Sequence, residues 1–392
     1  MTKHKILYYS SHPTHDTSSE VGYATHQRET IEALRELGHD VINVNMGDIG
    51  MRGEDSAYTS GNKKGGIKEV IKALVPKFFW ISLKDFKLLL HDKRAGDVLE
   101  KAVLEHKPDF IYERNEILQD SGLKVAKKHS IKYFLEVNAP FPEEMVKLEG
   151  RSFFHWFSPS MEKRKYQYAS KIFVVSTALR TYLKNKFGTD TSKILLAPNR
   201  ITPSKFYRLE GRNEVKTFGF VGSILPHHKV ELLIRAFSKL KRQNSELTLR
   251  IIGDGAQREE LEELTSKLDI LDSVIFVGKV PNDKVIEELN LMDVCVMPGT
   301  NWYGSPVKVF EYGAACKAII APNQIPLLDV MTSGKDGLLS EENEEALYEA
   351  MLYMVEHPEE SRAMAETFHQ KVLNQYTWLH AAKEIVSAHE TE

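Results

Sequence analysis

The sequence predicts an α/β protein with two doubly wound domains, each built on a parallel sheet. Short apolar strand patterns alternate with helical patterns, and this alternation is typical of parallel sheets that helices cover on both faces. The alternation runs once in each half and stops between residues 197 and 216, where Pro, Asn, Gly and charged residues replace it. With 392 residues, the chain is also longer than the ~250–300 residues that usually fold around a single hydrophobic core. We therefore expect an N-terminal domain over residues 1–200 and a C-terminal domain over residues 201–373.

The expected elements follow the chain in a regular order. In the first half, strand patterns lie at residues 5–11, 40–46, 109–116, 132–140 and 171–177, with helical patterns at 25–40, 97–108 and 122–130. In the second half, strand patterns lie at 216–223, 247–255, 273–280, 293–299 and 318–321, with helical patterns at 228–244, 256–270, 282–292 and from 305. In open α/β sheets, ligands bind at the carboxyl ends of the strands, so the two domains are expected to face each other across a ligand-binding cleft.

Composition excludes several classes of function. The 52 basic and 55 acidic residues give a formal net charge of −3, which offers no overall electrostatic case for a nucleic-acid partner. Two cysteines in so long a chain argue against a disulfide-built secreted protein. The N-terminus enters a strand pattern directly, and no segment reaches the ~18–20 uninterrupted apolar residues of a membrane span. We therefore expect a cytoplasmic protein.

A helix that opens at Ser305 and Pro306 is the most informative local feature. Serine is a favoured N-cap and proline a favoured first helical residue, so free amide groups and a partial positive charge are expected here, as in an anion site. Lys308 and Glu311 are three residues apart and share a face of this helix. Spacing alone leaves two readings evenly balanced: a surface ion pair, or a face turned toward a ligand.

Glycines follow two of the expected strands of the second half. Gly222 leaves the first strand, and Gly253, Asp254 and Gly255 leave the next. Glycine lets backbone amides approach a phosphate, although αβ turns need glycine for purely structural reasons as well. Neither loop fits G-x-G-x-x-G, so no dinucleotide cofactor is indicated.

An ordered set of motifs over nearly the whole chain resembles the GT-B fold retaining glycosyltransferases of family 4, also called glycosyl transferases group 1. The stretch VGYATHQRETIEALRELGHDV is similar to the family's glycine loop and first helix, and LAPNRITPSKF to its hinge segment. In the second half, FGFVGSILPHHKVELLIRAF, LRIIGDGAQREELEEL, VIFVGKVPNDKV and SPVKVFEYGAACKAIIAP complete the series. The resemblance implies two Rossmann-like domains, an acceptor-binding one and a nucleotide-sugar-binding one, and it implies that the C-terminal helix 374–392 packs back on the first domain.

The resemblance also implies roles for individual residues. Glu311 matches the second glutamate of the E-x7-E signature, which accepts hydrogen bonds from the ribose hydroxyls, and Lys229 matches the lysine that contacts the donor diphosphate. Arg114 and Asn138 join these two as candidate catalytic residues, and Tyr23 and Glu136 are expected on the acceptor side. The implied donor-binding residues are Gly22, Gly222, Ser223, Asp254, Gly278, Val280, Gly304, Ser305, Pro306, Val307 and Lys308.

Four positions depart from the family pattern. Tyr303 replaces the first glutamate of E-x7-E, Ser223 replaces the arginine usually paired with the diphosphate lysine, and Asn138 replaces a common histidine. The family's GKP after the signature helix is CKA here. We interpret these departures as a variant of the site.

The expected reaction is therefore metal-independent sugar transfer with retention, from a nucleotide-diphosphate sugar to a hydroxyl of a glycan, a lipid-linked molecule or a small molecule. UDP or GDP is the expected nucleotide, and no cofactor is expected. No Asp-x-Asp occurs in the sequence, so there is no obvious carboxylate pair to hold a divalent metal ion against a diphosphate. Two alternatives are a GT-B epimerase or hydrolase acting on sugar nucleotides, and a non-catalytic nucleotide-sugar binder; Tyr303 and Ser223 favour the latter.

Two segments of the first half mix aromatic and basic residues, at 67–94 and at 151–169. Two readings are open for them. They form a peripheral contact with the anionic inner face of a membrane, or they are amphipathic helices whose aromatic side chains pack inward and whose lysines face water.

Overall fold

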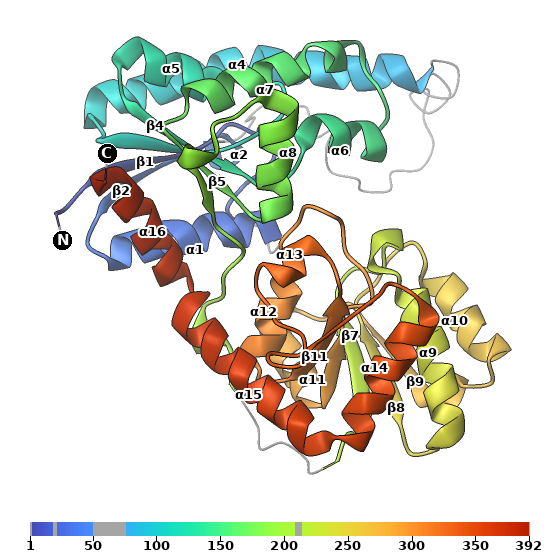
Figure 1. Ribbon diagram of the computed structural model, residues 1–392. Coiled ribbons are helices and arrows are strands. Elements are labelled where there is room, and N and C mark those ends of the chain that lie inside the picture. The colour runs from blue at the N-terminus through green and yellow to red at the C-terminus, as the bar shows by residue number, and fades with distance from the viewer. Residues whose placement is uncertain (1, 19–21, 50–75, 208–213, 392) are drawn as a thin grey trace. The chain divides into compact units, whose positions relative to one another are not determined.

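The computed structural model describes residues 2–18, 22–49, 76–207 and 214–391 (Figure 1). The chain divides into two compact units. Unit 1 holds Met1–Val175, Leu179–Ala197 and Ala382–Glu392, and unit 2 holds Ser176–Ala178 and Pro198–Ala381. Each unit contains one six-stranded parallel sheet, which confirms the predicted fold class.

The sheet of unit 1 has the strand order β2-β1-β3-β4-β5-β6. Its strands are β1 (Lys5–Ser10), β2 (Asp40–Asn45), β3 (Phe110–Arg114), β4 (Lys132–Val137), β5 (Lys171–Val174) and β6 (Ile194–Leu196). Its helices are α1 (Gly22–Glu36), α2 (Met46–Ile49), α4 (Lys77–His106), α5 (Ser121–His129), α6 (Phe141–Leu148), α7 (Ser158–Tyr168) and most of α8 (Thr177–Phe187), with the short η1 (Phe153–Trp156) and η2 (Thr191–Lys193). In Figure 1, α4, α5 and α7 lie on one side of this sheet and α1 and α16 (Trp378–Glu390) on the other.

The C-terminal part of α16 packs on the sheet of unit 1. The His389 ring lies 4.8 Å from the Phe110 ring, and the His389 carbonyl oxygen accepts a hydrogen bond from Lys132 at 3.3 Å. The Glu390 carboxylate lies 3.2 Å from the His4 ring. The last turns of the chain therefore complete the cover of the N-terminal sheet.

Helix α4 is the longest described helix. It begins after Pro76 and ends where Lys107 takes a left-handed conformation before Pro108. One stripe of its residues is buried at helical spacing: Ile81, Asp85, Leu88, Asp92, Ala95, Leu99 and Val103. The sequence thus attaches this helix to unit 1 along a single face.

The sheet of unit 2 has the strand order β12-β11-β10-β7-β8-β9. Its strands are β7 (Thr217–Val221), β8 (Thr248–Ile252), β9 (Val274–Gly278), β10 (Val294–Val296), β11 (Ala318–Pro322) and β12 (Leu338–Ser340). Its helices are α9 (Val230–Gln243), α10 (Arg258–Lys267), α11 (Val285–Asn290), α12 (Val307–Ala314), α13 (Ile325–Leu328), α14 (Glu344–Glu356) and α15 (Pro358–Gln375). Short 3-10 turns are η3 (Pro203–Lys205), η4 (Pro226–His228), η5 (Leu271–Ser273) and η6 (Asn282–Lys284).

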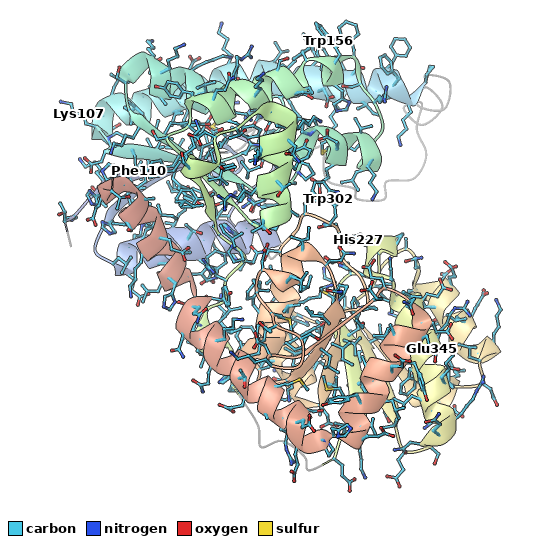
Figure 2. All side chains as sticks on the ribbon, viewed as in Figure 1. Lys107, Phe110, Trp156, His227, Trp302 and Glu345 are labelled. Atoms are coloured by element: carbon cyan, nitrogen blue, oxygen red, sulfur yellow. The ribbon has the colours of Figure 1, made fainter. Side chains whose placement is uncertain are left out.

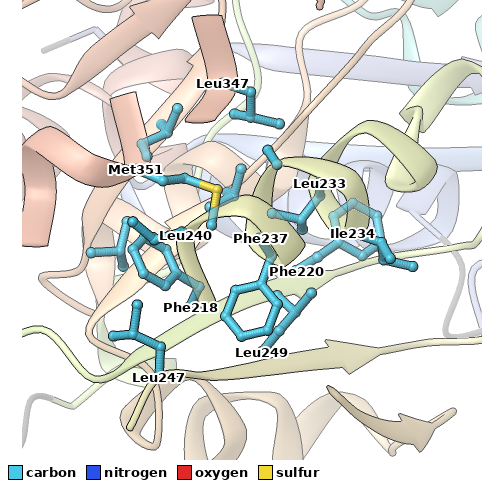
Figure 3. Packing of buried hydrophobic residues seen from close by; sticks show 14 of the residues in the cluster. Phe218, Phe220, Leu233, Ile234, Phe237, Leu240, Leu247, Leu249, Leu347 and Met351 are labelled. Carbon is cyan, nitrogen blue, oxygen red and sulfur yellow. The ribbon is translucent and has the colours of Figure 1, made fainter. Parts of the chain in front are cut away.

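Strand β7 shows why both faces of this sheet are buried. Phe218 and Phe220 point to one face and pack with Phe237 of α9 and Met351 of α14 (Figure 3). On the other face, Val221 packs in a second cluster with residues of α12 and α15. Gly219 leaves room there for Met292, whose sulfur would lie 2.0 Å from an added Cβ. Continuous apolar sequence is what a strand covered on both faces requires.

Each sheet has one point where the strand order reverses. In unit 1 this point lies between β1 and β3, which pair from Ile6↔Phe110 to Ser10↔Arg114. In unit 2 it lies between β7 and β10. Loops that leave the two strands at such a point diverge and open a crevice, which is where open α/β sheets bind ligands. The loops after β7 and β10 in unit 2, and those after β1 and β3 in unit 1, are therefore the candidate ligand-binding regions.

No helix within the described ranges is both long enough and apolar enough to span a lipid bilayer.

Candidate functional site

The loops that leave β7 and β8 lie against each other through their backbones. Gly222 has a φ of +148° and Gly253 a φ of +125°, conformations that favour glycine. The Gly222 amide donates to the Ile252 carbonyl at 2.9 Å, and a Cβ on Gly253 would lie 2.0 Å from the Gly222 carbonyl oxygen. These two glycines therefore let the loops after β7 and β8 pack backbone against backbone.

Lys308 of α12 reaches over this edge. Its ammonium lies 4.7 Å from the centre of the Phe220 ring and would lie 2.6 Å from a Cβ on Gly222. Burial lowers the pKa of Lys308 to about 7. A lysine held largely out of water gains from a bound anion, which would restore its full charge.

His228 is the polar partner of Lys308. The two nitrogens, Nζ of Lys308 and Nε2 of His228, lie 3.0 Å apart, and His228 Nδ1 lies against the carbonyl oxygen of Ser223. Burial, and then the neighbouring Lys308, lower the pKa of His228 to about 4. The neutral tautomer that fits both contacts carries its proton on Nδ1 and accepts from Lys308 at Nε2. His228 therefore orients Lys308 without competing for its charge.

Glu311 lies one turn further along α12. It is half-buried, and burial raises the pKa of its carboxyl, with Lys308 opposing that shift. Within residues 2–18, 22–49, 76–207 and 214–391, its side chain has no hydrogen bond or ion pair. The surface ion pair with Lys308, one of the two readings of the sequence, is therefore not formed in the described chain. A half-buried carboxylate without a partner is a strong acceptor for ligand hydroxyl groups.

The start of α12 differs from the prediction by one residue. The helix begins at Val307 and its N-cap is Pro306, so Ser305 as N-cap and Pro306 as first helical residue were wrong. The physical reason is that Ser305 is engaged elsewhere: its hydroxyl accepts from the Asn199 amide at 2.9 Å, and its carbonyl accepts from the Asn199 side chain. No side chain caps the terminus, so the amides of Val307 and Lys308 keep their donors for a ligand.

Lys229 lies at the start of α9 in a left-handed conformation, with a φ of 51°. Its Nζ lies 2.6 Å from Glu342 Oε2, and the other Glu342 oxygen accepts from the Thr300 amide at 3.4 Å. Glu342 therefore ties the loop after β7 to the loops after β10 and β12. In this structure the charge of Lys229 is already paired.

The remaining residues predicted for the donor lie around the same edge of unit 2. The Gly304 amide donates to Asn301 at 2.6 Å, which closes the turn ahead of α12. Tyr303 stands at the position of the first glutamate of the signature. Its carbonyl oxygen accepts a hydrogen bond from the Ser176 hydroxyl at 2.6 Å. In Figure 2, the labelled Trp302 and His227, which follow β10 and β7, lie at the same end of unit 2.

Gly278, Val280 and Asp254 were also predicted to bind the donor. Gly278 is buried with a φ of +83°, and its carbonyl accepts from the Gly253 amide at 2.8 Å. Val280 is half-buried. Asp254 is exposed and lies 3.8 Å from Arg258. These residues are on the β8–β9 side of the crevice, away from Lys308.

Three of the predicted catalytic and acceptor residues of unit 1, namely Arg114, Asn138 and Glu136, form one network around the buried Glu136 carboxylate. Arg114 Nη1 lies 2.7 Å from Glu136 Oε1 at the ends of β3 and β4. Glu136 also accepts from Tyr112 at 3.0 Å and from the Asn138 amide, and the His26 ring lies 3.6 Å away. Burial tends to raise the pKa of Glu136, but His26, Arg114 and the hydrogen bonds outweigh it and hold the pKa low. Glu136 is therefore an anion whose charge is compensated by neighbouring protein groups.

A second group at the reversal point of unit 1 was not predicted from the sequence. The loop after β1 stacks His12 on His15 at 3.7 Å, and His15 Nδ1 lies 2.9 Å from Glu116 in the loop after β3. The predicted Tyr23 stacks on the other side of His15 at 4.3 Å, next to Gly22 at the start of α1. Burial lowers the pKa of His12 to about 4.

The missed residues had weak local signals. His12 and His15 follow a predicted strand directly, and His228 precedes Lys229, so their place at strand ends could have marked them. Glu342 is 113 residues from its partner Lys229, and nothing local indicates that pairing.

Two family models match consecutive parts of the chain. The model described as Glycosyltransferase Family 4 matches residues 22–205, and the model described as Glycosyl transferases group 1 matches residues 204–371. Together they cover residues 22–371 and run through both units. The chain belongs to the group 1, family 4 glycosyltransferases.

Several named relatives of this family 4 member are glycosyltransferases. An uncharacterized glycosyltransferase of Haemophilus influenzae is 28% identical over 208 residues, which cover 50% of this chain and 57% of that protein. A 2-deoxystreptamine glucosyltransferase of Streptomyces kanamyceticus is 22% identical over 188 residues, which cover 42% of this chain and 49% of that protein. The chain thus matches about half the length of these two relatives. The glycogen synthase of Mycobacterium tuberculosis is 20% identical over 378 residues, covering 91% of this chain and 88% of that protein.

Solved structures share the fold of this family 4 chain. HepE of Anabaena, crystallised with UDP, has a TM-score of 0.70 at 13% identity and covers both chains completely. Sucrose-phosphate synthase of Thermosynechococcus elongatus has a TM-score of 0.70 at 17% identity and covers 100% of this chain and 99% of its own. These likenesses confirm the predicted GT-B architecture of two Rossmann-like units.

Proposed function

We propose that this chain is a retaining, metal-independent glycosyltransferase that moves a sugar from a nucleotide-diphosphate donor to a hydroxyl group. The observation that carries the proposal is the arrangement on α12. Lys308, with its pKa lowered to about 7 by burial, and the uncapped amides at Val307 and Lys308 lie beside a backbone edge that contains glycine. Glu311, on the same helix, has no hydrogen bond or ion pair among the described residues. This combination suits a ligand with an anionic diphosphate and a neighbouring diol.

The donor is held in three parts in this proposal. The diphosphate lies against the start of α12, with Lys308 and Lys229 as its cations and Gly222 allowing its approach. The ribose hydroxyls donate to Glu311, one turn further along the same helix. The base lies toward Gly278 and Val280. HepE of Anabaena has been crystallised with UDP and with UDP-glucose, which supports a uridine nucleotide ahead of a guanosine one.

The chemistry that we propose needs charge stabilisation more than covalent catalysis. As the bond between the anomeric carbon and the diphosphate oxygen breaks, Lys308, Lys229 and the start of α12 stabilise the charge that develops on the leaving group. The acceptor hydroxyl attacks from the face that the diphosphate leaves, and its proton passes to a diphosphate oxygen. Configuration is retained, and the products are the glycoside and the nucleoside diphosphate.

We assign the acceptor to unit 1, which holds the predicted acceptor-side residues Tyr23 and Glu136 and the candidate catalytic residues Arg114 and Asn138. His15 and Glu116 lie at the reversal point of that sheet, 2.9 Å apart, and offer donors and acceptors to a sugar or alcohol. The acceptor is a hydroxyl of a glycan, a lipid-linked molecule or a small molecule.

The test is incubation of the protein with UDP-, GDP- and ADP-sugars, with and without glycan and lipid-linked acceptors and with and without EDTA. Acceptor-dependent nucleotide release that EDTA leaves unchanged, with an α-linked product from an α-linked donor, is the expected result. Release of free sugar without an acceptor would instead indicate a hydrolase or epimerase. Binding of UDP without turnover on any acceptor would indicate a nucleotide-sugar binder.

A further inference from the structure

Helix α4 carries a row of apolar side chains on the face opposite its buried stripe. Phe79, Leu83, Phe86 and Leu90, here called the apolar stripe, follow the spacing i, i+4, i+7 and i+11 and are 60%, 47%, 46% and 60% exposed. Each lies two residues before a buried one of the same helix, which is ~200° around the helix axis. The sequence left open whether these aromatic residues pack inward; Phe79 and Phe86 do not.

The short helix η1 extends the apolar stripe. Phe153 and Trp156 are 59% and 73% exposed, and Figure 2 shows Trp156 at the outer edge of unit 1. The Phe153 amide donates to the Ser82 hydroxyl at 2.9 Å, and the Phe86 ring lies 6.2 Å from that of Phe154. These contacts join η1 to α4, so the two form one surface. Single exposed apolar residues are ordinary, but six large ones on one surface mark an interaction site.

Charge is distributed unevenly around this surface. Between residues 76 and 96, every charged side chain that reaches solvent is basic: Lys77, Lys84, Lys87, Lys93 and Arg94. The two acidic residues of that stretch, Asp85 and Asp92, are buried. A helix with phenylalanine and leucine on one face and a basic border favours the interface of an anionic bilayer.

We propose that the apolar stripe, with Phe153 and Trp156, is a docking surface for an anionic lipid bilayer. The apolar side chains enter the acyl boundary, and Lys87, Lys93 and Arg94 lie at the level of the anionic headgroups. A symmetric contact with a second copy is disfavoured because it would place one basic border against another. This surface rests on exposure and charge, independently of the proposed transfer reaction.

Vesicle sedimentation tests the proposal. The full chain is mixed at low salt with vesicles of phosphatidylglycerol and phosphatidylcholine, or of phosphatidylcholine alone. We expect at least tenfold more binding to the anionic vesicles, and a decrease as salt is raised. The variant F79S/L83S/L90S should lose binding at least tenfold, and K87E/K93E/R94E should lose the preference for anionic vesicles.

Leu104→Ser is the matched control. Leu104 is 59% exposed on the same helix, but it lies beyond the basic border and next to Glu105, so this variant should bind vesicles as the wild type does. UDP binding by all variants should be unchanged, which separates this proposal from the proposed function. If F79S/L83S/L90S fails to fold, as judged by circular dichroism, K87E/K93E/R94E decides alone.

Three results would overturn the proposal. The wild-type protein stays in the supernatant with anionic vesicles; or the substituted proteins sediment as the wild type does; or analytical ultracentrifugation shows a dimer that F79S/L83S/L90S abolishes while vesicles bind neither protein. The last result would assign the surface to a second copy of this chain.

Discussion

Near the reversal points, the two units differ in how many partners their buried charged residues have. In unit 1, Glu136 is surrounded by Arg114, Tyr112, Asn138 and His26, so its charge is met inside the protein. In unit 2, Glu311 has no side-chain partner among the described residues, and the polar partner of Lys308 is a neutral histidine. The same fold feature therefore holds a completed network in one unit and an incomplete one in the other.

The difference has a physical consequence. A buried network with all partners present stabilises its own unit and fixes the orientation of each side chain. An incomplete one costs stability in the free protein, and the missing partners define the ligand. Among the described residues of unit 2, Lys308 forms no ion pair and Glu311 accepts no hydrogen bond, and in the proposed function a diphosphate joined to a sugar supplies both.

The largest effect is expected where the network is complete. Arg114→Met removes the cation beside the buried Glu136, and breaking one side of a buried ion pair costs about 3–5 kcal/mol. Amide hydrogen exchange in β3 and β4 measures the loss at the strands that carry this network. UDP affinity should not change, because Lys308, Lys229 and Glu311, to which we assign the diphosphate and the ribose, are all in unit 2.

Two further variants check this expectation. Arg258→Met removes a partly exposed pair with Glu262 in unit 2 and should change stability by less than about 1 kcal/mol. The double variant Arg114→Met, Glu136→Leu should recover part of the loss. A loss of UDP affinity in Arg114→Met would contradict the separation of the two networks.

The second effect is on the ligand itself. Glu311→Ala removes a carboxylate that accepts from the ribose, and charge-assisted hydrogen bonds of this kind contribute about 1.5–3 kcal/mol each. We expect UDP to bind about 100-fold more weakly by isothermal titration calorimetry, with a smaller loss for Glu311→Gln. Glu262→Ala, a surface carboxylate of the same unit, is the control. Unchanged affinity in Glu311→Ala would show that the ribose lies elsewhere.

The third effect is a pH dependence of UDP affinity, which we expect to arise from Lys308 of unit 2. With its pKa lowered to about 7, Lys308 is mostly neutral above pH 7 in the free protein, and a bound diphosphate favours its charged form. Binding therefore takes up a proton, so UDP affinity should fall by up to about tenfold per pH unit between pH 7 and 9. His228, with a pKa of about 4, stays neutral throughout this range.

Lys308→Met should bind UDP weakly and with little dependence on pH. Lys239→Met, a surface lysine that pairs with Glu344 and Glu345, should keep the wild-type slope. A wild-type affinity that is flat from pH 7 to 9 would mean that Lys308 does not meet the diphosphate.

Local sequence patterns were sufficient to predict the fold class and most of the strands. The alternation of strands and helices predicted five of the six strands of each sheet and missed the short β6 and β12. The run from Thr217 to Val221 is continuously apolar because both faces of that strand are covered. These patterns also placed Lys308 and Glu311 on one face of one helix. Such features depend on neighbours in sequence, where spacing is informative.

Contacts between residues far apart in the sequence could not be predicted from local patterns. Ser305 reads as an N-cap, but Asn199, 106 residues away, occupies both of its oxygens and the helix begins later. The aromatic residues of α4 read equally well as buried or exposed, because periodicity shows that a helix has two faces but not which one meets the core. Glu342, which pairs with Lys229, had no signal at all.

The pair of Lys229 and Glu342 gives the smallest and most specific prediction. It is the one place in the described part of the predicted donor site where a predicted cation is already neutralised, so a diphosphate must compete with Glu342. A half-exposed ion pair contributes up to about 1 kcal/mol, and Glu342→Gln should therefore tighten UDP binding about threefold to fivefold while keeping an oxygen for Thr300. Glu341→Gln, one residue earlier, is the control and should have no effect. Weaker binding in Glu342→Gln would show that this carboxylate positions Lys229 for the ligand, in the way that Glu136 and its partners position one another in unit 1.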